Sequence, residues 1–377
     1  MIIEAWHPIW GGGQKVAYEI SKRLSENYNI KVDLFVMNLA GKQENFVENI
    51  NNKFRVIYVG KKRNWTFKDR IFWLLDLVNI VRKFHKKYEY NLIYAHSTLP
   101  GLPGKLLSKW LRIPVVFHVH GSSVETLEKM YGKGLKTKIL KFLNIFIQRM
   151  IKYDLEITVD RKFLEYKNVN KPIYIPNGVD IEKFDEIKVS KSEDIFKILF
   201  VGRLHPQKGL KYLIEAAKTL FKNKYININY RFIIIGDGEE KSILKELVKR
   251  YGLEDIFIFK GYLSGYKLIK EYKSSHLFIL PSLYEGFPLT ILEAWAAKLP
   301  VLVSNVGEIP FIVKEGYNGF LVNPGDVNDL TEKLRLILDM DKTYLKKIGE
   351  NGYNLVKNNY DWNIITDNIF NKLVKLI

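Results

Sequence analysis

The chain has 377 residues, of which 47% are hydrophobic and 27% are charged, with ordinary glycine and proline contents. This length favours two domains over a single core, and the composition excludes a disordered, collagen-like or repeat-built chain. Because cysteine is absent, disulfides, thiolate zinc sites and thiol nucleophiles are excluded as well.

The net charge of +18 is concentrated in the first half of the chain. Residues 1–180 hold 30 Lys and Arg against 16 Asp and Glu, a surplus of +14. Nucleic acid, an acidic membrane surface and a phosphorylated substrate would each fit such a surplus. The charge therefore predicts an anionic partner without choosing among these three.

No stretch of the sequence is typical of a membrane-spanning helix. The longest mainly apolar stretch, Ile71 to Val81, is interrupted by Asp76 and is shorter than the roughly 18 residues that a span needs. The N-terminus, MIIEAWHPIW, lacks the basic region and the small-residue cleavage site of a signal peptide. We therefore expect a cytoplasmic protein.

Short apolar runs alternate with amphipathic stretches, a pattern typical of parallel strands joined by helices. Residues 14–26 place Val16, Ile20 and Leu24 at helical spacing, and residues 209–220 repeat this pattern. The sequence thus predicts an α/β fold with two Rossmann-like, doubly wound parallel-sheet domains. The predicted strands are IIEAW, KVDLFVM, FRVIYV, LIYAH, PVVFHVH, EITV and PIYIP in the first domain, and KILFVG, RFIIIG, IFIFKG, LFILPS and PVLVS in the second.

The domain boundary is expected near PNGVD, residues 176–180, where an Asn-Gly turn signal precedes a polar, charged segment. We assign residues 1–178 to an N-terminal domain and 179–361 to a C-terminal domain, with a helix over about 362–377 that can pack back onto the first. Ligands of open parallel sheets bind at the carboxyl ends of the strands. The loops that follow strands are therefore the candidate sites.

Three consecutive glycines, Gly11, Gly12 and Gly13, lie between the first predicted strand and the first predicted helix. A backbone without side chains can approach an anion at a helix N-terminus. A dinucleotide fingerprint would need its third glycine where Val16 stands. The two interpretations that remain are an anion site and a simple tight turn.

The strand KILFVG leads into Arg203 and Lys208 just before a helix. Arginine can clamp two oxygens of one group, whereas lysine acts as a point charge. Charge-assisted hydrogen bonds of this kind contribute about 1.5–3 kcal/mol each. The pair predicts a diphosphate site, and the alternative is a solvated basic loop.

The segment LPSLYEGFPLTILEAWAAKLPVLVS reads as strand, turn, helix and strand. Pro288 suits the first position of the helix. Glu285 then lies in the loop before this helix. Glu293, five residues after Pro288, lies about 7.5 Å from it along the helix axis. Backbone amides at a helix start attract phosphate, and carboxylates nearby accept hydrogen bonds from hydroxyls. A ribose and a sugar supply such hydroxyls.

Taken in order along the chain, these segments resemble the retaining glycosyltransferases of GT-B architecture that form family 4. The resemblance covers nearly the whole chain and implies two domains facing across a cleft, the first on the acceptor side and the second binding a nucleotide-sugar. The chain departs from the family in its short first strand and at Gly307-Glu308 and Pro310-Phe311, where Gly-Gly and then Pro-Glu are frequent. The motifs that carry the resemblance are GGGQ, HVHG, IPNGVD, FVGRLHPQKG, IIGDGEE and the pair of Glu285 and Glu293.

The resemblance implies that the donor is a UDP- or GDP-sugar. Arg203 and Lys208 would hold its diphosphate, and Glu293 its ribose. His120 would lie beside the reacting carbon of the sugar. The remaining donor contacts would come from Gly12 and Gly13 on the diphosphate, and from Glu285 and the backbone of Gly286, Phe287, Pro288, Leu289 and Thr290 on the transferred sugar and its phosphate. The predicted catalytic residues are His120, Glu285, Arg203 and Lys208.

The resemblance also implies a front-side displacement in which the departing phosphate takes the acceptor proton. Two cations and a helix start would stabilise that phosphate, so we predict no metal ion and no other cofactor. The D-x-D of Asp339 and Asp341 is interpreted as solvated surface. His118 shares a strand face with His120 and is interpreted as structural, and Gly236 to Gly238 as a connection between a strand and a helix.

The predicted function is transfer of a sugar from a nucleotide-diphosphate-sugar to a lipid-linked or polysaccharide acceptor. A nicotinamide dehydrogenase is disfavoured because GGGQKV and GDGEEK both lack the third glycine. A sugar-nucleotide epimerase of the same architecture remains an alternative. A basic nucleic-acid-binding protein is suggested by charge alone, and we expect no nucleic-acid partner. The sequence does not identify the transferred sugar, the nucleotide base of the donor or the acceptor.

The stretch from Lys129 to Tyr153 contains no Asp or Glu and interleaves basic with apolar residues. This pattern is typical of a helix that lies at a membrane surface. A core helix with a basic edge is the alternative. The stretch predicts peripheral association with the inner face of an anionic membrane.

Overall fold

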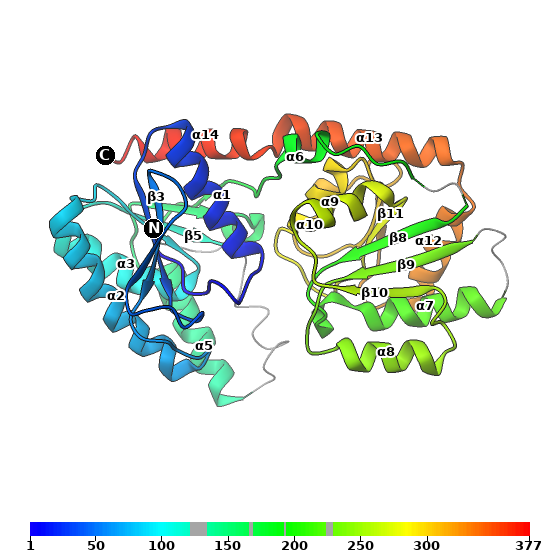
Figure 1. Cartoon of the computed structure of the whole chain (residues 1–377), viewed down its shortest axis with the longest axis horizontal. Helices are drawn as coiled ribbons and strands as arrows, with labels where there is room; N and C mark the ends of the chain where they lie inside the picture. Colours follow the sequence, from blue (N-terminus) through cyan, green and yellow to red (C-terminus); the bar gives the residue numbers. More distant parts are fainter. Residues whose placement is uncertain (121–133, 166–168, 192–193, 224–228) are drawn as a thin grey trace. The chain divides into compact units, whose positions relative to one another are not determined.

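The computed structural model describes residues 1–120, 134–165, 169–191, 194–223 and 229–377 (Figure 1). Its contacts divide the chain into two compact units. Unit 1 comprises Met1–Asn177 together with Trp362–Ile377, and unit 2 comprises Gly178–Asp361. This division lies one residue from the boundary that the Asn-Gly turn signal indicated.

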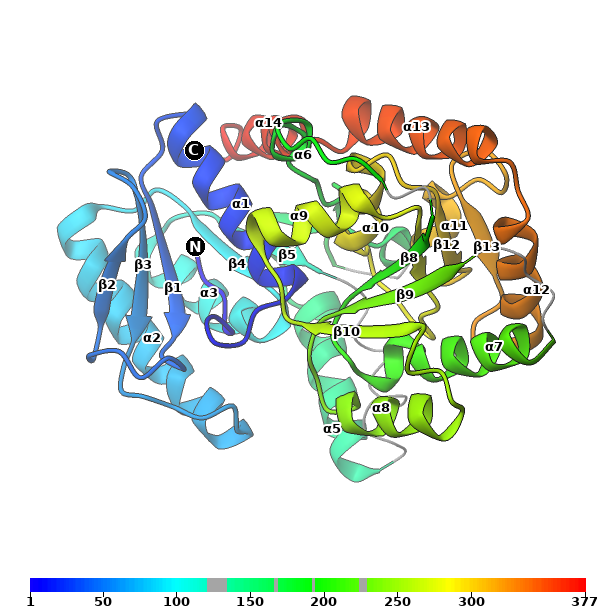
Figure 2. The ribbon, with the colours of Figure 1, turned by 45° about the vertical axis from the view of Figure 1, so that its right-hand side comes forward.

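Unit 1 is built on two sets of strands, which lie on either side of the N-terminal segment (Figure 2). Ile2 forms single parallel bridges to Phe35 and to Ala95, one residue in each set. The predicted first strand, residues 2–6, is therefore too long at its C-terminal end, because the backbone hydrogen bonds to the flanking strands come from Met1 to Glu4 and Ile2 alone forms ladder bridges. The strands are β1 (Val32–Met37), β2 (Phe46–Asn49) and β3 (Phe54–Val59), and then β4 (Ile93–His96), β5 (Val115–Val119), β6 (Leu155–Thr158) and β7 (Ile173–Tyr174).

Helices cover these strands, and the predicted apolar face of the first is confirmed because Val16, Ile20 and Leu24 are buried. The last helix of the chain packs on the first, where the rings of Tyr28 and Phe370 stack with centroids 3.9 Å apart. The helices of unit 1 are α1 (Gly12–Asn27), α2 (Phe67–Tyr88), α3 (Thr98–Leu111), α5 (Leu135–Ile145) with the π-helical turn η1 (Phe146–Met150), the 3₁₀ turn η2 (Arg161–Glu165) and α14 (Trp362–Leu373).

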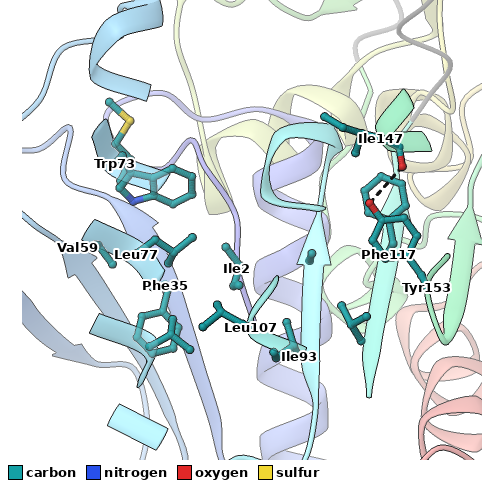
Figure 3. Close-up of a cluster of buried hydrophobic side chains, with 14 of the residues drawn as sticks. Ile2, Phe35, Val59, Trp73, Leu77, Ile93, Leu107, Phe117, Ile147 and Tyr153 are labelled. Carbon is teal, nitrogen blue, oxygen red and sulfur yellow. Dashed lines mark hydrogen bonds between the residues drawn. The ribbon is translucent and has the colours of Figure 1, made fainter. Parts of the chain in front are cut away.

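The core of unit 1 joins α2 and α3 to the strands (Figure 3). Trp73 and Leu77 of α2 are fully buried, as is Phe117 of β5. Full burial of such a side chain stabilises the fold by about 1.5–3 kcal/mol. Tyr153 stacks on Phe117, and its hydroxyl donates to the carbonyl of Ile147 at 3.1 Å. The first part of η1 is thereby anchored to this core.

Unit 2 holds one six-stranded sheet of order β10-β9-β8-β11-β12-β13 with all strands parallel. Counted from β8 the order is 3-2-1-4-5-6, so the direction of winding reverses between β8 and β11. In such sheets the ligand crevice lies outside the carboxyl ends of the strands at this switch point. The strands are β8 (Phe196–Val201), β9 (Tyr230–Ile235), β10 (Phe257–Gly261), β11 (Leu277–Leu280), β12 (Val301–Ser304) and β13 (Phe320–Val322).

The helices of unit 2 alternate with its strands, which confirms the predicted doubly wound α/β fold. The predicted D-x-D lies on the surface, where Asp339 is the C-cap of α12 and Asp341 caps the N-terminus of α13. The helices are α6 (Ile181–Asp185), the 3₁₀ turn η3 (Pro206–Lys208), α7 (Leu210–Asn223), α8 (Lys241–Arg250), α9 (Gly265–Ser274), α10 (Leu289–Ala296), α11 (Ile309–Ile312), α12 (Val327–Leu338) and α13 (Lys342–Asn359).

Candidate active site

The loops after β8 and β11, on the two sides of the switch point, carry most of the predicted donor residues. Residues 202–209 follow β8, and residues 281–288 follow β11. The amide of Leu283 donates to the carbonyl of Gln207 at 2.8 Å, and the Gln207 side chain donates to the carbonyl of Tyr284 at 2.8 Å. These bonds tie the two loops together, so the side chains they carry keep a fixed spacing.

Lys208 and Glu285 meet between these loops. The Lys208 ammonium donates to Glu285 Oε1 at 2.6 Å, and the Ser282 hydroxyl donates to the same oxygen at 2.6 Å. The Glu285 side chain is only 7% exposed, so its charge needs these partners. An ammonium has three donors. Lys208 can therefore hold Glu285 with one and offer the others to an anion.

Two glycines let neighbouring loops approach the site closely. Gly209 has φ +67°, and a Cβ there would lie 2.0 Å from the carbonyl oxygen of Pro281. Gly307, in the loop after β12, has φ +57°, and a Cβ there would lie 2.0 Å from the carbonyl oxygen of Glu285. Any larger residue would have to displace the backbone that carries Glu285.

Arg203 extends from the loop after β8 with a side chain that is 70% exposed. Its guanidinium lies 3.9 Å from the Glu239 carboxylate, which is also 3.3 Å from the His205 imidazole. An exposed pair at this distance contributes little, so Arg203 can turn toward a bound anion. Glu239 lies in the turn that joins β9 to α8, which confirms that Gly236 to Gly238 connect a strand to a helix.

The N-terminus of α10 completes this part of the site. Pro288 is its N-cap and not its first residue, because ψ of 114° keeps Pro288 extended. No side chain caps this helix, so the amides of its first turn, which begins with Leu289 and Thr290, favour negative charge. Glu293, one turn further on, is buried and accepts a hydrogen bond from the Tyr272 hydroxyl at 2.8 Å. Burial, with Glu293 alongside, raises the pKa of Tyr272 well above its ordinary value, so this hydroxyl remains a donor.

In unit 1 the glycine motif and His120 lie together. The helix α1 begins at Gly12 with Gly11 as its N-cap, and no side chain caps it. A Cβ on Gly13 would lie 3.8 Å from the ring of His120. The glycine motif and His120, which were both predicted as site residues of the N-terminal domain, therefore lie next to each other at the start of α1.

His120 belongs to a column of stacked imidazoles. Its ring lies 4.4 Å from that of His118, and its Nε2 is hydrogen-bonded to Nδ1 of His96 at 3.1 Å. The Tyr94 hydroxyl is bonded in turn to Nδ1 of His118 at 2.9 Å. Burial lowers the pKa of His120 to about 4, so its ring is neutral at physiological pH. A neutral ring can donate or accept a hydrogen bond but carries no charge toward a phosphate.

Each of the three histidines offers one ring nitrogen, and these lie within 4.8 Å of one another, close enough to be considered as metal ligands. The planes of His96 and His120 differ by 5°, and those of His118 and His120 by 29°. Ligand nitrogens must converge on an ion at about 2.0–2.1 Å, whereas stacked rings hold their nitrogens side by side. The geometry favours a hydrogen-bonded stack, and metal independence remains a prediction.

Three residues of this arrangement were missed in the sequence. His96 pairs in register with His118 on the neighbouring strand, and its place at a strand end was a usable signal. Ser282 precedes Glu285 by three residues and could have been noticed for that reason. Tyr272 lies 21 residues before Glu293 on another helix, and nothing in the local pattern relates the two.

Comparison with known proteins agrees with this geometry. Residues 10–183 match the family described as Glycosyltransferase Family 4, and residues 181–355 match Glycosyl transferases group 1. The chain is 29% identical to the Escherichia coli UDP-Gal:alpha-D-GlcNAc-diphosphoundecaprenol alpha-1,3-galactosyltransferase, over 93% of this chain and 92% of that enzyme.

Solved structures of other proteins share the fold. Sucrose-phosphate synthase from Thermosynechococcus elongatus superposes with a TM-score of 0.84 at 22% identity, covering 97% of this chain and 94% of that chain. Anabaena HepE, in complex with UDP and glucose, gives a TM-score of 0.74 at 19% identity, covering 100% and 99%. These relationships favour sugar transfer over the epimerase alternative. The chain belongs to glycosyltransferase family 4 and is a glycosyltransferase with the GT-B fold.

Proposed function

We propose that this enzyme transfers the sugar of a UDP- or GDP-sugar to a lipid-linked or polysaccharide acceptor, with retention of configuration and without a metal ion. The names of its relatives support the substrate classes, because the Escherichia coli enzyme is named for UDP-Gal and a diphosphoundecaprenol acceptor, and HepE is in complex with UDP and glucose. The observation that carries the proposal is the Lys208–Glu285 pair beside the start of α10.

The residues of unit 2 supply what a departing nucleoside diphosphate needs. Lys208 and Arg203 bring two positive charges to the loop after β8, and the first amides of α10 add the positive end of a helix dipole. Preorganised donors of this kind stabilise charge that develops as the bond to the sugar breaks. Glu293, held by Tyr272, accepts from the ribose hydroxyls, and Glu285 accepts from the sugar.

In unit 1 we assign the sugar contact to His120 and a contact with the diphosphate to the glycines at the start of α1. A neutral His120 suits a hydrogen bond to a sugar hydroxyl near the reacting carbon. His96 and His118 keep the ring in place through the hydrogen bond and the stack already described. The proton of the acceptor hydroxyl passes to the leaving phosphate oxygen as the new glycosidic bond forms and the old one breaks.

The stereochemical outcome and the metal requirement test this proposal. We expect a product with the anomeric configuration of the donor, and a rate that EDTA leaves unchanged, because the two cations and the helix start neutralise the leaving group. The coupling constant of the anomeric proton, measured by NMR on product from a defined UDP-sugar or GDP-sugar, reports the configuration. An inverted product, or activity that EDTA removes and Mg²⁺ restores, would contradict it.

A surface of unit 1 supports membrane association. No helix in the described part of the chain is long and apolar enough to cross a bilayer. The helical segment α5–η1 instead presents a row of exposed apolar side chains at helical spacing, and Phe142 among them is 68% exposed. Lys138 is exposed on the same helix, and Lys141 is half-buried. The row comprises Leu135, Ile139, Phe142, Phe146 and Met150.

The opposite side of the same segment packs inward. Thr137, Ile147 and Gln148 are buried, and Gln148 donates to the Thr98 hydroxyl at 2.8 Å. The core interpretation therefore accounts for one face of the segment and leaves the exposed row unexplained. An apolar face flanked by lysines is the arrangement of helices that lie in the headgroup region of anionic bilayers. We therefore propose that the enzyme is peripheral on the cytoplasmic face of a membrane, near a lipid-linked acceptor.

Charge reversal at Lys136, Lys138 and Lys141 is expected to release the enzyme from anionic vesicles. Each lysine near acidic lipid contributes about 1 kcal/mol, so three reversals should weaken binding by at least a hundredfold. Co-sedimentation at low salt measures the effect, with neutral vesicles and high salt as further conditions. Reversal of Lys245, Lys249 and Lys267, which are exposed on α8 and α9, is the matched control. Equal pelleting of both triple variants, or no wild-type binding at low salt, would overturn membrane association.

A further inference from the structure

A cavity away from the candidate active site lies in unit 2, with a volume of ≈ 390 Å³, which is within the usual range for small-molecule sites. The ends of α9 and α10, the start of α13 and the segment before β8 form its walls. Five lysines and one histidine line it, namely Lys191, Lys273, His276, Lys298, Lys342 and Lys346. Glu350 is the single acidic residue of this lining.

The cavity lies at the amino ends of the strands of the unit 2 sheet, and the candidate active site lies at their carboxyl ends. Phe196 is the first residue of β8, and His276 and Pro300 directly precede β11 and β12. These are the amino ends of parallel strands, whereas Lys208 and Glu285 follow the carboxyl ends. Strands of four to six residues rise about 3.3 Å per residue. The two sites are therefore separated by roughly the length of a strand and can be occupied independently.

Three of the five lysines of the lining lack an ion-pair partner among the described residues. Within the described ranges, Lys273, Lys298 and Lys346 have no carboxylate within ion-pair distance, although the Lys298 ammonium lies 4.7 Å from the centre of the Tyr353 ring. Partial burial, together with Lys188 and Lys298, lowers the pKa of Lys273, against an opposing effect of Asp185. The Asp185 carboxylate itself accepts a hydrogen bond from the Tyr353 hydroxyl at 2.7 Å. Like charges gathered in this way destabilise the empty fold.

The cavity also has an apolar wall. Phe196 and Leu345 are buried side chains of this lining, and the His276 ring stacks on Phe196 with centroids 5.0 Å apart. Nδ1 of His276 accepts a hydrogen bond from the amide of Lys197 at 3.0 Å, which fixes the ring. A ligand for this cavity would combine strong negative charge with an apolar or flat body. Lysine is a frequent point-charge partner of phosphate.

We propose that this cavity is a second anion site, which binds a small molecule bearing a phosphate or diphosphate group, separate from the nucleotide-sugar site. The phosphate lies among Lys273, Lys298 and Lys346, and the apolar part of the molecule lies on Phe196 and Leu345. Occupation relieves the repulsion among the lysines. The site is independent of the proposed donor chemistry, since it shares no residue with the loops after β8 and β11.

Pyrophosphate binding, measured by calorimetry on the full chain, tests the site. Because the donor site also binds diphosphate, the measurements use Lys208→Met protein, in which that site is weakened. We expect saturable binding that Lys273→Gln with Lys346→Gln weakens at least tenfold. The matched control, Lys249→Gln with Lys267→Gln, removes the same charge from exposed positions on α8 and α9 and should change the Kd by less than twofold.

Thermal unfolding gives a second readout. The Lys273→Gln, Lys346→Gln protein should have a higher Tm than its parent without ligand, because like charges have been removed, and pyrophosphate should no longer raise it. Pelleting with vesicles that contain phosphatidic acid then distinguishes a lipid phosphate from a soluble one, since only a lipid source makes the pelleting depend on Lys273 and Lys346. Pyrophosphate affinity and pelleting that are both unaffected by these two substitutions would overturn the proposal.

Discussion

Replacing Lys208 by methionine is expected to lower kcat/KM for sugar transfer by about 10²–10³-fold, the loss typical of removing one preorganised donor from a developing anion. Methionine keeps the apolar stem of the side chain and removes the ammonium that contacts Glu285. The measurement is the initial rate at several donor concentrations, with Lys211→Met as the control. Lys211 is exposed on the next helix, where its nearest carboxylate, that of Glu215, is 4.0 Å away.

A structural role for Lys208 has to be separated from this catalytic one. Lys208→Met leaves the buried Glu285 carboxylate with the Ser282 hydroxyl but without its cation, so some loss of stability is expected. Adding Glu285→Gln removes the unpaired charge. The double variant should therefore regain stability toward urea but remain inactive. Recovery of transfer in the double variant would show that Lys208 serves only to neutralise Glu285.

Glu293 also has a structural role beside its proposed contact with the donor, and this changes the expected effect of replacing it. The donor contact assigned from the sequence predicts that Glu293→Ala abolishes most transfer without unfolding the chain. In the structure Glu293 is buried and bonded to the Tyr272 hydroxyl. Truncation would leave that hydroxyl without this acceptor, at a cost of about 1–3 kcal/mol. Glu293→Gln, which keeps an acceptor oxygen, is therefore the better variant for judging the ribose contact.

The parts of the fold that could be predicted are those that depend on local pattern. Strands buried on both faces read as continuous apolar runs, and β8, β9 and β11 were found in this way. β2 was missed because none of its four residues is buried and it carries Glu48. The first strand was overestimated because its backbone hydrogen bonds to the flanking strands end at Glu4 and Ile2 alone forms ladder bridges, which no propensity indicates.

The site residues that follow strands could be predicted from the sequence. The contacts between residues that are far apart in the sequence could not. Lys208 and Glu285 could each be identified from a loop, but their contact depends on the switch in strand order between β8 and β11. The lysine-lined cavity was not predicted at all. Lys273 and Lys346 belong to different helices, and among many lysines nothing in the sequence distinguishes them.

The segment where this chain departs from its family is also explained by the fold. Gly307 lies at φ +57°, and the amide of Glu308 donates to the carbonyl of Gly286 at 3.2 Å. Glu308 is fully buried. The loop after β12 therefore supports the backbone of Glu285 and Gly286, and its close approach requires a glycine at position 307.

Gly307→Ala is accordingly expected to reduce both stability and transfer, and Gly265→Ala provides the matched control. Gly265 has φ +54°, nearly that of Gly307, but a Cβ there would meet nothing within 4 Å. Both substitutions incur the cost of a left-handed L-residue, about 1–2 kcal/mol. Only Gly307→Ala also places a Cβ 2.0 Å from the carbonyl oxygen of Glu285, which adds about 1–3 kcal/mol of overpacking.

The relief of that contact must move Glu285, and a displacement of about 1 Å at a reacting centre can reduce the rate a hundredfold. Urea denaturation and kcat/KM, measured on both variants, should therefore show a larger loss of stability in Gly307→Ala than in Gly265→Ala, and a loss of transfer in Gly307→Ala alone. If both alanine variants lost the same stability and both kept full activity, the loop after β12 would have no part in positioning Glu285. If Gly307→Ala lost activity while Lys208→Met did not, the loop would act on the donor through Gly286 and the start of α10, and not through the Lys208–Glu285 pair.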